Sequence, residues 1–296
     1  VLLKSIIVGF LVGIVASVYR WILAGAEELS FATYHYLRNN LILIPIAFLV
    51  LGAAGFFVGT LVHKYSMISG SGIPQVKGVI MGYFKNNWFS TLIAKFVGGA
   101  VSILGGLSLG REGPSIQLGA CIAQGVGDKF ATSRTEKKIL IASGAGAGLA
   151  AAFNAPLAGA MFAMEEIFKY LSPVVLLSTM AAAVASDFVS KIIFGNNPIF
   201  NFSVEGNIPL SGYWLLFILG AVLGAAGAFY NYILIKTQAL YKKIKLLNAK
   251  ARPIIPFILA GILGLIFPLA LGSGHTMLGE LQLSTNITFL LWQIVK

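Results

Sequence analysis

The stretch IASGAGAGLAAAFNAPLAGAM, residues 141–161, decides the fold class of this chain. It lies inside Ile139–Met164, a run without charge, and a helix needs about 20 mostly apolar residues to cross a bilayer. Asn154-Ala-Pro156 is expected to end one helix and start another, because proline breaks a helix interior. Broken helices at membrane depth are tolerated only where they face protein or a water-filled cavity. The stretch therefore predicts a membrane protein with an interrupted helix.

The composition of the whole chain agrees with a membrane protein. Apolar residues make up 57% of the 296 residues and charged residues only 10%, and the mean hydropathy is +0.87. Soluble domains are usually about 25% charged. These values exclude a disordered chain, a secreted disulfide scaffold and an ordinary cytosolic enzyme.

Apolar runs along the rest of the chain predict an all-α polytopic membrane protein. Several runs have full spanning length: Ser5–Ala26, Leu41–Val62, Tyr170–Ile193, Gly206–Ile235 and Pro253–Gly274. Arg20 is the only charged residue in the first of these runs. Three others are too short to cross alone and indicate broken helices: Phe96–Gly110, Gly113–Gln124 and Leu281–Val295.

The distribution of charge predicts the orientation in the membrane. Lys and Arg number 21 against 10 Asp and Glu, for a net charge of +11. Residues 236–252 are basic and free of acids between two apolar runs, which favours a cytoplasmic loop over a nucleic-acid surface. Alternation then places Lys64–Lys95 and Glu165-Glu166 inside, and Glu27–Asn40 and Gly195–Leu210 outside. The chain has a single cysteine, Cys121, and three scattered histidines, His35, His63 and His275. One cysteine cannot form an internal disulfide and the histidines lack metal-ligand spacing, so we expect no disulfide, metal site or cofactor.

Gly70-Ser71-Gly72-Ile73-Pro74 is the first segment with the chemistry of a binding site. Its glycines free the backbone to turn, and proline suits the first turn of a helix. A helix start presents unpaired N–H groups and a positive dipole end, which together bind anions. The alternative is a simple turn between two spans.

Gly110-Arg111-Glu112-Gly113-Pro114 is the second such segment and separates two short runs. A charge at bilayer depth costs about 2.5–3.5 kcal/mol, and a surface loop explains it poorly because the flanking runs are too short for separate crossings. We expect Glu112 at the start of another helix, where its carboxylate competes with a free anion and protonation releases it.

Glu165-Glu166 ends an apolar run on the predicted cytoplasmic side. Adjacent residues of a helix point about 100° apart, so at most one of the two is expected to face a pathway. The other meets solvent or a basic neighbour such as Lys169. The alternative is a pair that solvates the helix end.

Together these segments resemble the CLC family of chloride channels and proton-coupled chloride antiporters. Gly70–Pro74 and Gly110–Pro114 are similar to two signature segments of that family, and Gly148–Gly159 is similar to a third, in the same order. The resemblance implies that Glu112 is the gating glutamate, Glu166 the internal proton-transfer glutamate and Glu165 its accessory neighbour. The anion-binding residues that it implies are Ser71, Gly72, Ile73, Arg111, Glu112 and Gly113. Gln75 departs from the acidic residue that often follows the first segment.

A repeat is also visible in the sequence. Gly272-Ser273-Gly274 follows an apolar run 202 residues after Gly70-Ser71-Gly72 (272 − 70), as in transporters built from internal repeats. We expect a first membrane repeat over 1–204 and the beginning of a second over 205–296. The counterpart of Glu112 would then lie near position 314 (112 + 202), so the second, inverted repeat is expected to be incomplete.

The sequence therefore predicts chloride transport, with proton-coupled antiport as the first interpretation and a passive voltage- or pH-gated chloride channel as the alternative. An intramembrane enzyme using Glu112 and Glu166 as acid and base is disfavoured, because no nucleophile or metal set accompanies them. An inert fragment is a third possibility. The expected partners are chloride, protons, the lipid bilayer and a second copy in a homodimer, with no nucleic acid, and the expected location is a bacterial-type inner (cell) membrane.

Overall fold

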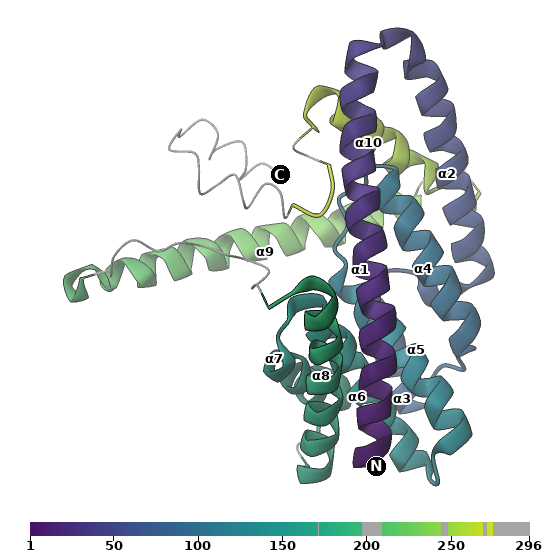
Figure 1. Ribbon diagram of the computed structural model, residues 1–296. Coiled ribbons are helices and arrows are strands. Elements are labelled where there is room, and N and C mark those ends of the chain that lie inside the picture. The colour runs from purple at the N-terminus through teal and green to yellow at the C-terminus, as the bar shows by residue number, and fades with distance from the viewer. Residues whose placement is uncertain (171, 197–208, 244–247, 269–270, 275–296) are drawn as a thin grey trace. The chain divides into compact units, whose positions relative to one another are not determined.

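A computed structural model describes residues 1–170, 172–196, 209–243, 248–268 and 271–274 of the chain. Within these residues the structure is helical and contains no strand, which confirms the all-α prediction. Residues 1–200 and 250–296 form one compact unit, and residues 201–249 form a second. The helices of the larger unit (Figure 1) are α1 (Leu2–Asn39), α2 (Ile44–Lys64), α3 (Ile73–Met81), α4 (Trp88–Leu104), α5 (Glu112–Phe130), α6 (Arg134–Phe153), α7 (Pro156–Phe162), α8 (Pro173–Phe194) and α10 (Ile254–Ile266).

Helix α6 forms the centre of the larger unit and packs against α1, α5 and α8. Its glycines allow the neighbouring backbones to come close. A Cβ on Gly144 would lie 2.4 Å from the Gly119 carbonyl oxygen of α5, and one on Gly148 would lie 2.2 Å from the Ser115 carbonyl oxygen. No side chain fits at these crossings, so the small residues determine how closely the helices pack, as in other membrane helix pairs.

The predicted break in the central run is confirmed. Helix α6 ends at Phe153, Asn154 adopts the left-handed conformation with φ 53°, and α7 begins at Pro156. The side chain of Asn154 accepts hydrogen bonds from Arg20 of α1 (3.2 Å) and from Ser190 of α8 (3.2 Å). These bonds give the charged side chain of Arg20 a polar partner within the helix packing.

Four helical segments among the described residues are long and apolar enough to cross a membrane: Leu2–Asn39, Leu41–Lys64, Pro173–Phe194 and Leu210–Tyr241. Three elements differ from the sequence prediction. Helix α1 continues to Asn39, through residues that the sequence placed in an outer connection. Helix α10 has 13 residues and ends at Ile266, well before the predicted limit at Gly274. Helix α4 begins at Trp88 and therefore contains Lys95, which the sequence placed in an inner connection.

The smaller unit contains a short 3-10 turn, Leu210–Gly212, and α9 (Trp214–Lys243), a single helix of 30 residues. Near its end the ammonium group of Lys236 donates a hydrogen bond to the Tyr232 hydroxyl (2.8 Å), one helical turn earlier. Several parts of the prediction lie outside the described residues: positions 197–208 of the predicted outer loop, Lys245, His275 and the run Leu281–Val295.

Candidate anion site at two helix starts

The segment Gly70–Pro74 forms a tight turn that leads into α3. Gly70 and Gly72 have φ of +68° and +96°, a left-handed conformation that glycine adopts without the steric cost of a side chain. Helix α3 begins at Ile73 with proline in its first turn, as predicted. The hydroxyl oxygen of Ser71 accepts the N–H of Ile73 (3.4 Å), so its hydrogen remains available to donate to an anion.

The segment Gly110–Pro114 starts a second helix. Helix α5 begins at Glu112, directly after Arg111, so the expectation that Glu112 lies at a helix start is confirmed. Its carboxylate and that of Glu27 both interact electrostatically with the Arg111 guanidinium. Arg111 Nε is buried and has no hydrogen-bond partner among the described residues.

These two helix starts touch. A Cβ on Gly113 would lie 2.7 Å from the Ser71 carbonyl oxygen and 3.1 Å from its Cβ, and one on Gly72 would lie 2.5 Å from Gln117 Oε1. The Gln117 amide in turn donates to the Met67 carbonyl (2.7 Å). Glycine at position 113 lets the start of α5 lie directly against Ser71, and glycine at position 72 leaves room for the Gln117 side chain against the turn before α3.

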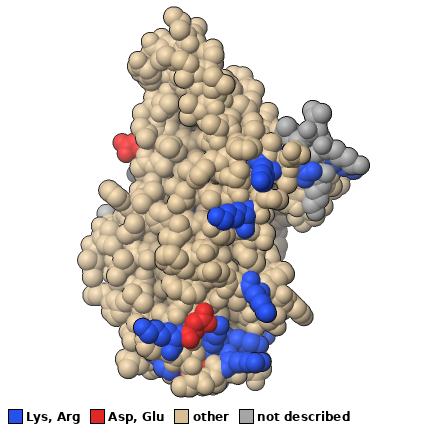
Figure 2. Space-filling model, turned by 90° about the vertical axis from the view of Figure 1, so that its right-hand side faces the viewer, with Lys and Arg blue, Asp and Glu red and all other residues tan. Residues whose placement is uncertain are grey.

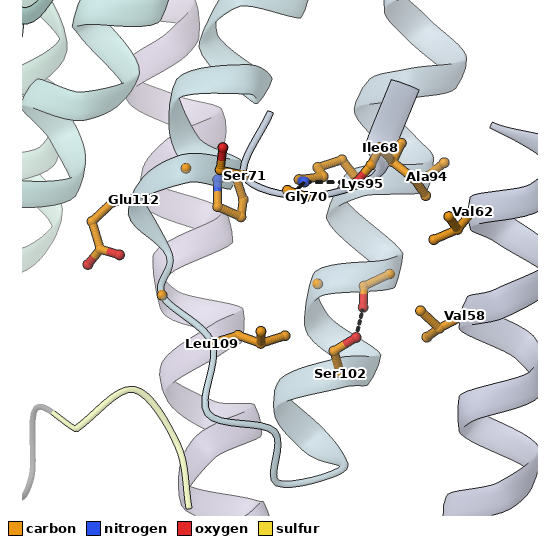
Figure 3. A pocket seen from close by; sticks show the side chains of 15 residues that line it. Val58, Val62, Ile68, Gly70, Ser71, Ala94, Lys95, Ser102, Leu109 and Glu112 are labelled. Carbon is orange, nitrogen blue, oxygen red and sulfur yellow. Dashed lines mark hydrogen bonds between the residues drawn. The ribbon is translucent and has the colours of Figure 1, made fainter. Parts of the chain in front are cut away.

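Ser71, Glu112 and Gly113 line one cavity of about 520 Å³. Figure 3 shows Ser71 beside Gly70 on one wall and the Glu112 carboxylate turned away from Ser71. Most of the remaining lining residues come from α2, α4 and the approach to α5, and include Val58, Val62, Ser102 and Leu109. The structure therefore brings together residues that are about 40 positions apart in the sequence, as an anion site shared by two helix starts requires.

Lys95 is a further charged group of this cavity, and the sequence analysis did not identify it. The residue is 7% exposed, and its ammonium group donates to the carbonyl oxygens of Ile68 (2.9 Å) and Gly70 (2.6 Å) (Figure 3). Its position in the sequence could have revealed it, because Lys95 is a single charged residue among the mostly apolar residues of Trp88–Leu104. No carboxylate forms an ion pair with it among the described residues, so its positive charge acts on the cavity.

Glu166 lies apart from the cavity, in a π-helical turn, Ala163–Phe168, that follows α7. Its carboxylate forms an ion pair with Lys77 of α3, and its side chain is 45% exposed. The hydrogen bond and the charge of Lys77, with a smaller effect of Lys169, hold the pKa of Glu166 below its usual range. Glu165 is exposed. One of the two carboxylates, that of Glu166, is therefore oriented by a basic partner, Lys77, which the sequence analysis did not identify.

The second Gly-Ser-Gly segment has the same backbone pattern as the first. Gly272 and Gly274 have φ of +70° and +86°. Glu27 of α1 accepts hydrogen bonds from the backbone N–H (2.8 Å) and the hydroxyl (3.1 Å) of Ser273. A carboxylate can therefore accept hydrogen bonds from the donors of such a turn.

The titratable residues of the described part of the chain form no group of three or more His, Cys, Asp or Glu that would hold a metal ion. Cys121 is buried there. The side-chain amide of Asn86 donates a hydrogen bond to its sulfur (3.7 Å).

The fold and the site together define a class of protein: an integral membrane protein with broken helices, in which two helix starts meet at one cavity. Comparison with known proteins makes this specific. The chain belongs to the voltage gated chloride channel (CLC) family, which matches residues 54–295.

Curated relatives and solved structures agree with this family. The H(+)/Cl(-) exchange transporter ClcA of Citrobacter koseri is 33% identical over 290 residues, covering 94% of this chain and 60% of that protein. ClcA of Salmonella arizonae is 32% identical with the same coverage. The chain therefore spans about 60% of the length of these relatives.

A crystal structure of a slow cyanobacterial Cl−/H+ antiporter superposes with a TM-score of 0.88 at 29% identity, covering 99% of this chain and 70% of that one. A CLC-type fluoride/proton antiporter gives a TM-score of 0.82 at 23% identity, covering 99% and 73%. This second likeness concerns the fold alone.

Proposed function

We propose that this chain carries chloride across a membrane in exchange for protons, with Ser71 and Glu112 at the anion pathway. The observation that carries the proposal is the shared cavity of about 520 Å³, in which the start of α3 and the start of α5 are in contact. Helix starts and the buried ammonium of Lys95 supply positive potential without covalent chemistry. The names of the relatives, H(+)/Cl(-) exchange transporters, support the same transport class.

In this proposal chloride is held by the Ser71 hydroxyl and by backbone N–H groups of Gly72 and Gly113, while Arg111 contributes charge. Ile73, whose N–H donates to the Ser71 hydroxyl oxygen, orients that hydroxyl toward the anion. Glu112 is the gate. As a carboxylate, its negative charge competes with chloride for the positive start of α5, and as a neutral acid it no longer does.

Glu166 accepts protons from the cytoplasmic side, and Glu165 assists it from the solvent. The support for Glu166 is its half-buried position and its ion pair with Lys77. Lys77 belongs to α3, and the turn that carries the proposed anion ligand Ser71 leads directly into this helix. One nine-residue helix therefore connects the proposed proton site to the proposed anion site. A change of charge at Glu166 therefore acts on the element that binds chloride.

The test uses purified full-length protein reconstituted in liposomes, with chloride and pH electrodes recording both fluxes. Glu166→Gln is expected to retain chloride flux and to lose uphill proton movement, because an amide does not titrate. Glu165→Gln is the matched control and is expected to keep both. Undiminished proton pumping by Glu166→Gln would refute the assignment.

The proposal of antiport would be overturned if the protein conducted chloride as a passive channel. In a channel the reversal potential follows the chloride gradient alone, whereas coupled exchange makes it shift with an imposed proton gradient. The recording of reversal potential at two proton gradients distinguishes them.

Three further parts of the proposal concern the assembly. The first membrane repeat extends over 1–204 and the beginning of the second over 205–296, and the matching glycine conformations at 70, 72, 272 and 274 support this division. The protein forms a homodimer in a bacterial inner membrane, as its resemblance to the family implies. Cross-linking in native membranes and separation of inner from outer membranes test these two statements.

A further inference from the structure

A second hollow lies away from the proposed anion pathway. It has a volume of about 470 Å³ and is formed by the loop between α3 and α4, the end of α5 and the start of α6. Its charged lining consists of Lys85, Arg134, Lys137 and Lys138 with one acid, Asp128. Figure 2 shows Lys and Arg gathered around an acidic side chain at the end of the larger unit where α1 begins.

The positive charge of this hollow is mostly uncompensated. Asp128 forms an ion pair with Lys137, which neutralises the acid and leaves three cations. Lys85, Arg134 and Lys138 have no ion pair among the described residues, and all three are exposed. The general inward bias of positive charge explains lysines near this surface, but it does not require them to converge on one concavity.

The walls of the hollow are held in place. The side chains of Asn86 and Gln124 are hydrogen-bonded to each other (3.0 Å), and Gln124 also donates to the Asn86 carbonyl (2.8 Å). At the start of α6, the Ser133 hydroxyl accepts the N–H of Glu136 (3.1 Å). Lys85 and the first turn of α6 are thus presented by fixed backbone, which lowers the entropic cost of binding an anion between them.

The surroundings of the hollow favour a lipid as the source of that anion. Tyr83 is 78% exposed and Phe89 is 58% exposed, on either side of Lys85 in the chain. Exposed aromatic rings beside basic residues are typical of segments at the headgroup level of a membrane, and basic pockets on the cytoplasmic side bind anionic headgroups. A site for a free soluble phosphate would not need exposed aromatic rings next to it.

We infer that the hollow lined by Lys85, Arg134 and Lys138 binds the phosphate group of an anionic phospholipid of the inner leaflet. The three cations and the backbone N–H groups at the start of α6 contact the phosphate oxygens. Tyr83 and Phe89 lie at the level of the lipid headgroups. This site is independent of which ion the protein transports.

Native mass spectrometry of the purified full-length protein tests the site. Phosphatidylglycerol is added, and retention is compared with that of phosphatidylcholine. The triple variant K85Q/R134Q/K138Q is expected to retain phosphatidylglycerol about a hundredfold less than the unaltered protein, in line with the loss of three surface cations. The matched control K64Q/K129Q/K250Q removes the same charge from exposed positions outside the hollow and is expected to behave like the unaltered protein.

A second variant, R134K/K138R, keeps the charge and is expected to retain the lipid, which separates a lost charge from a damaged fold. Equal loss of lipid in the triple variant and its control would overturn the proposal, as would equal retention of the two phospholipids. Displacement of phosphatidylglycerol by an equal concentration of inorganic phosphate or glycerol 3-phosphate would also overturn it, since the site would then belong to a soluble anion.

Discussion

Gly113 of α5 packs directly against Ser71 of the turn before α3, so closely that a Cβ at position 113 would lie 2.7 Å from the Ser71 carbonyl oxygen. This contact joins the two segments that the sequence singled out. It also means that the geometry of the proposed anion site depends on the absence of one methyl group.

Gly113→Ala is therefore expected to weaken chloride binding by about tenfold or more, since overpacking costs about 1–3 kcal/mol and 1.4 kcal/mol corresponds to tenfold in affinity. Gly98→Ala is the control, because Gly98 lines the same cavity but its nearest neighbour to an added Cβ is Leu61 at 4.0 Å. Calorimetric titration with chloride measures both. Equal affinities in the two variants would contradict the close-contact argument.

Glu112→Gln is expected to make chloride flux independent of external pH, because an amide at the start of α5 has no proton to gain or lose. Flux into liposomes measured from acidic to neutral pH tests this. Glu28→Gln removes an exposed carboxylate of α1 and is expected to leave the pH dependence unchanged. A pH dependence that survives in Glu112→Gln would exclude Glu112 as the gate.

Lys77→Gln is expected to move proton uptake to higher pH. Lys77 holds the pKa of the Glu166 carboxyl below its usual range, so its removal raises that pKa and Glu166 becomes protonated at a higher pH. The pH dependence of proton flux from the inner side is the measurement, and Lys77→Arg, which keeps the charge, is expected to restore the original profile. A shift toward lower pH would show that Lys77 acts in another way.

Glu136 makes stability depend on pH in a defined window. Hydrogen bonds from Lys4 and from Thr132 lower the pKa of Glu136 from 4.5 to about 2. A lowered pKa stabilises the fold above the unfolded value, and this stabilisation is lost as the pH falls through the folded value. The difference in Tm between the unaltered protein and Glu136→Gln should therefore be constant above about pH 4.5 and shrink between there and about pH 2. A difference that does not change in that window would argue against the ion pair with Lys4.

The sequence predicted the helical class and the breaks because these depend on local properties. Asn154 and Pro156 interrupt the central helix whatever surrounds them, and Gly70 and Gly72 adopt conformations that glycine adopts without steric cost. The sequence likewise placed Glu112 at a helix start, since Arg111 and Glu112 separate two apolar runs that are each too short to cross the bilayer alone.

The sequence alone thus determined an all-helical membrane protein with interrupted helices, through apolar run length and backbone chemistry. The tertiary structure alone decided that Ser71 and Gly113 touch, that Lys95 is buried beside them and that Lys77 forms an ion pair with Glu166. The physical reason is that these relationships join residues distant in the chain. Run length and charge counting describe each segment separately, whereas the packing of α3, α4 and α5 determines which segments meet.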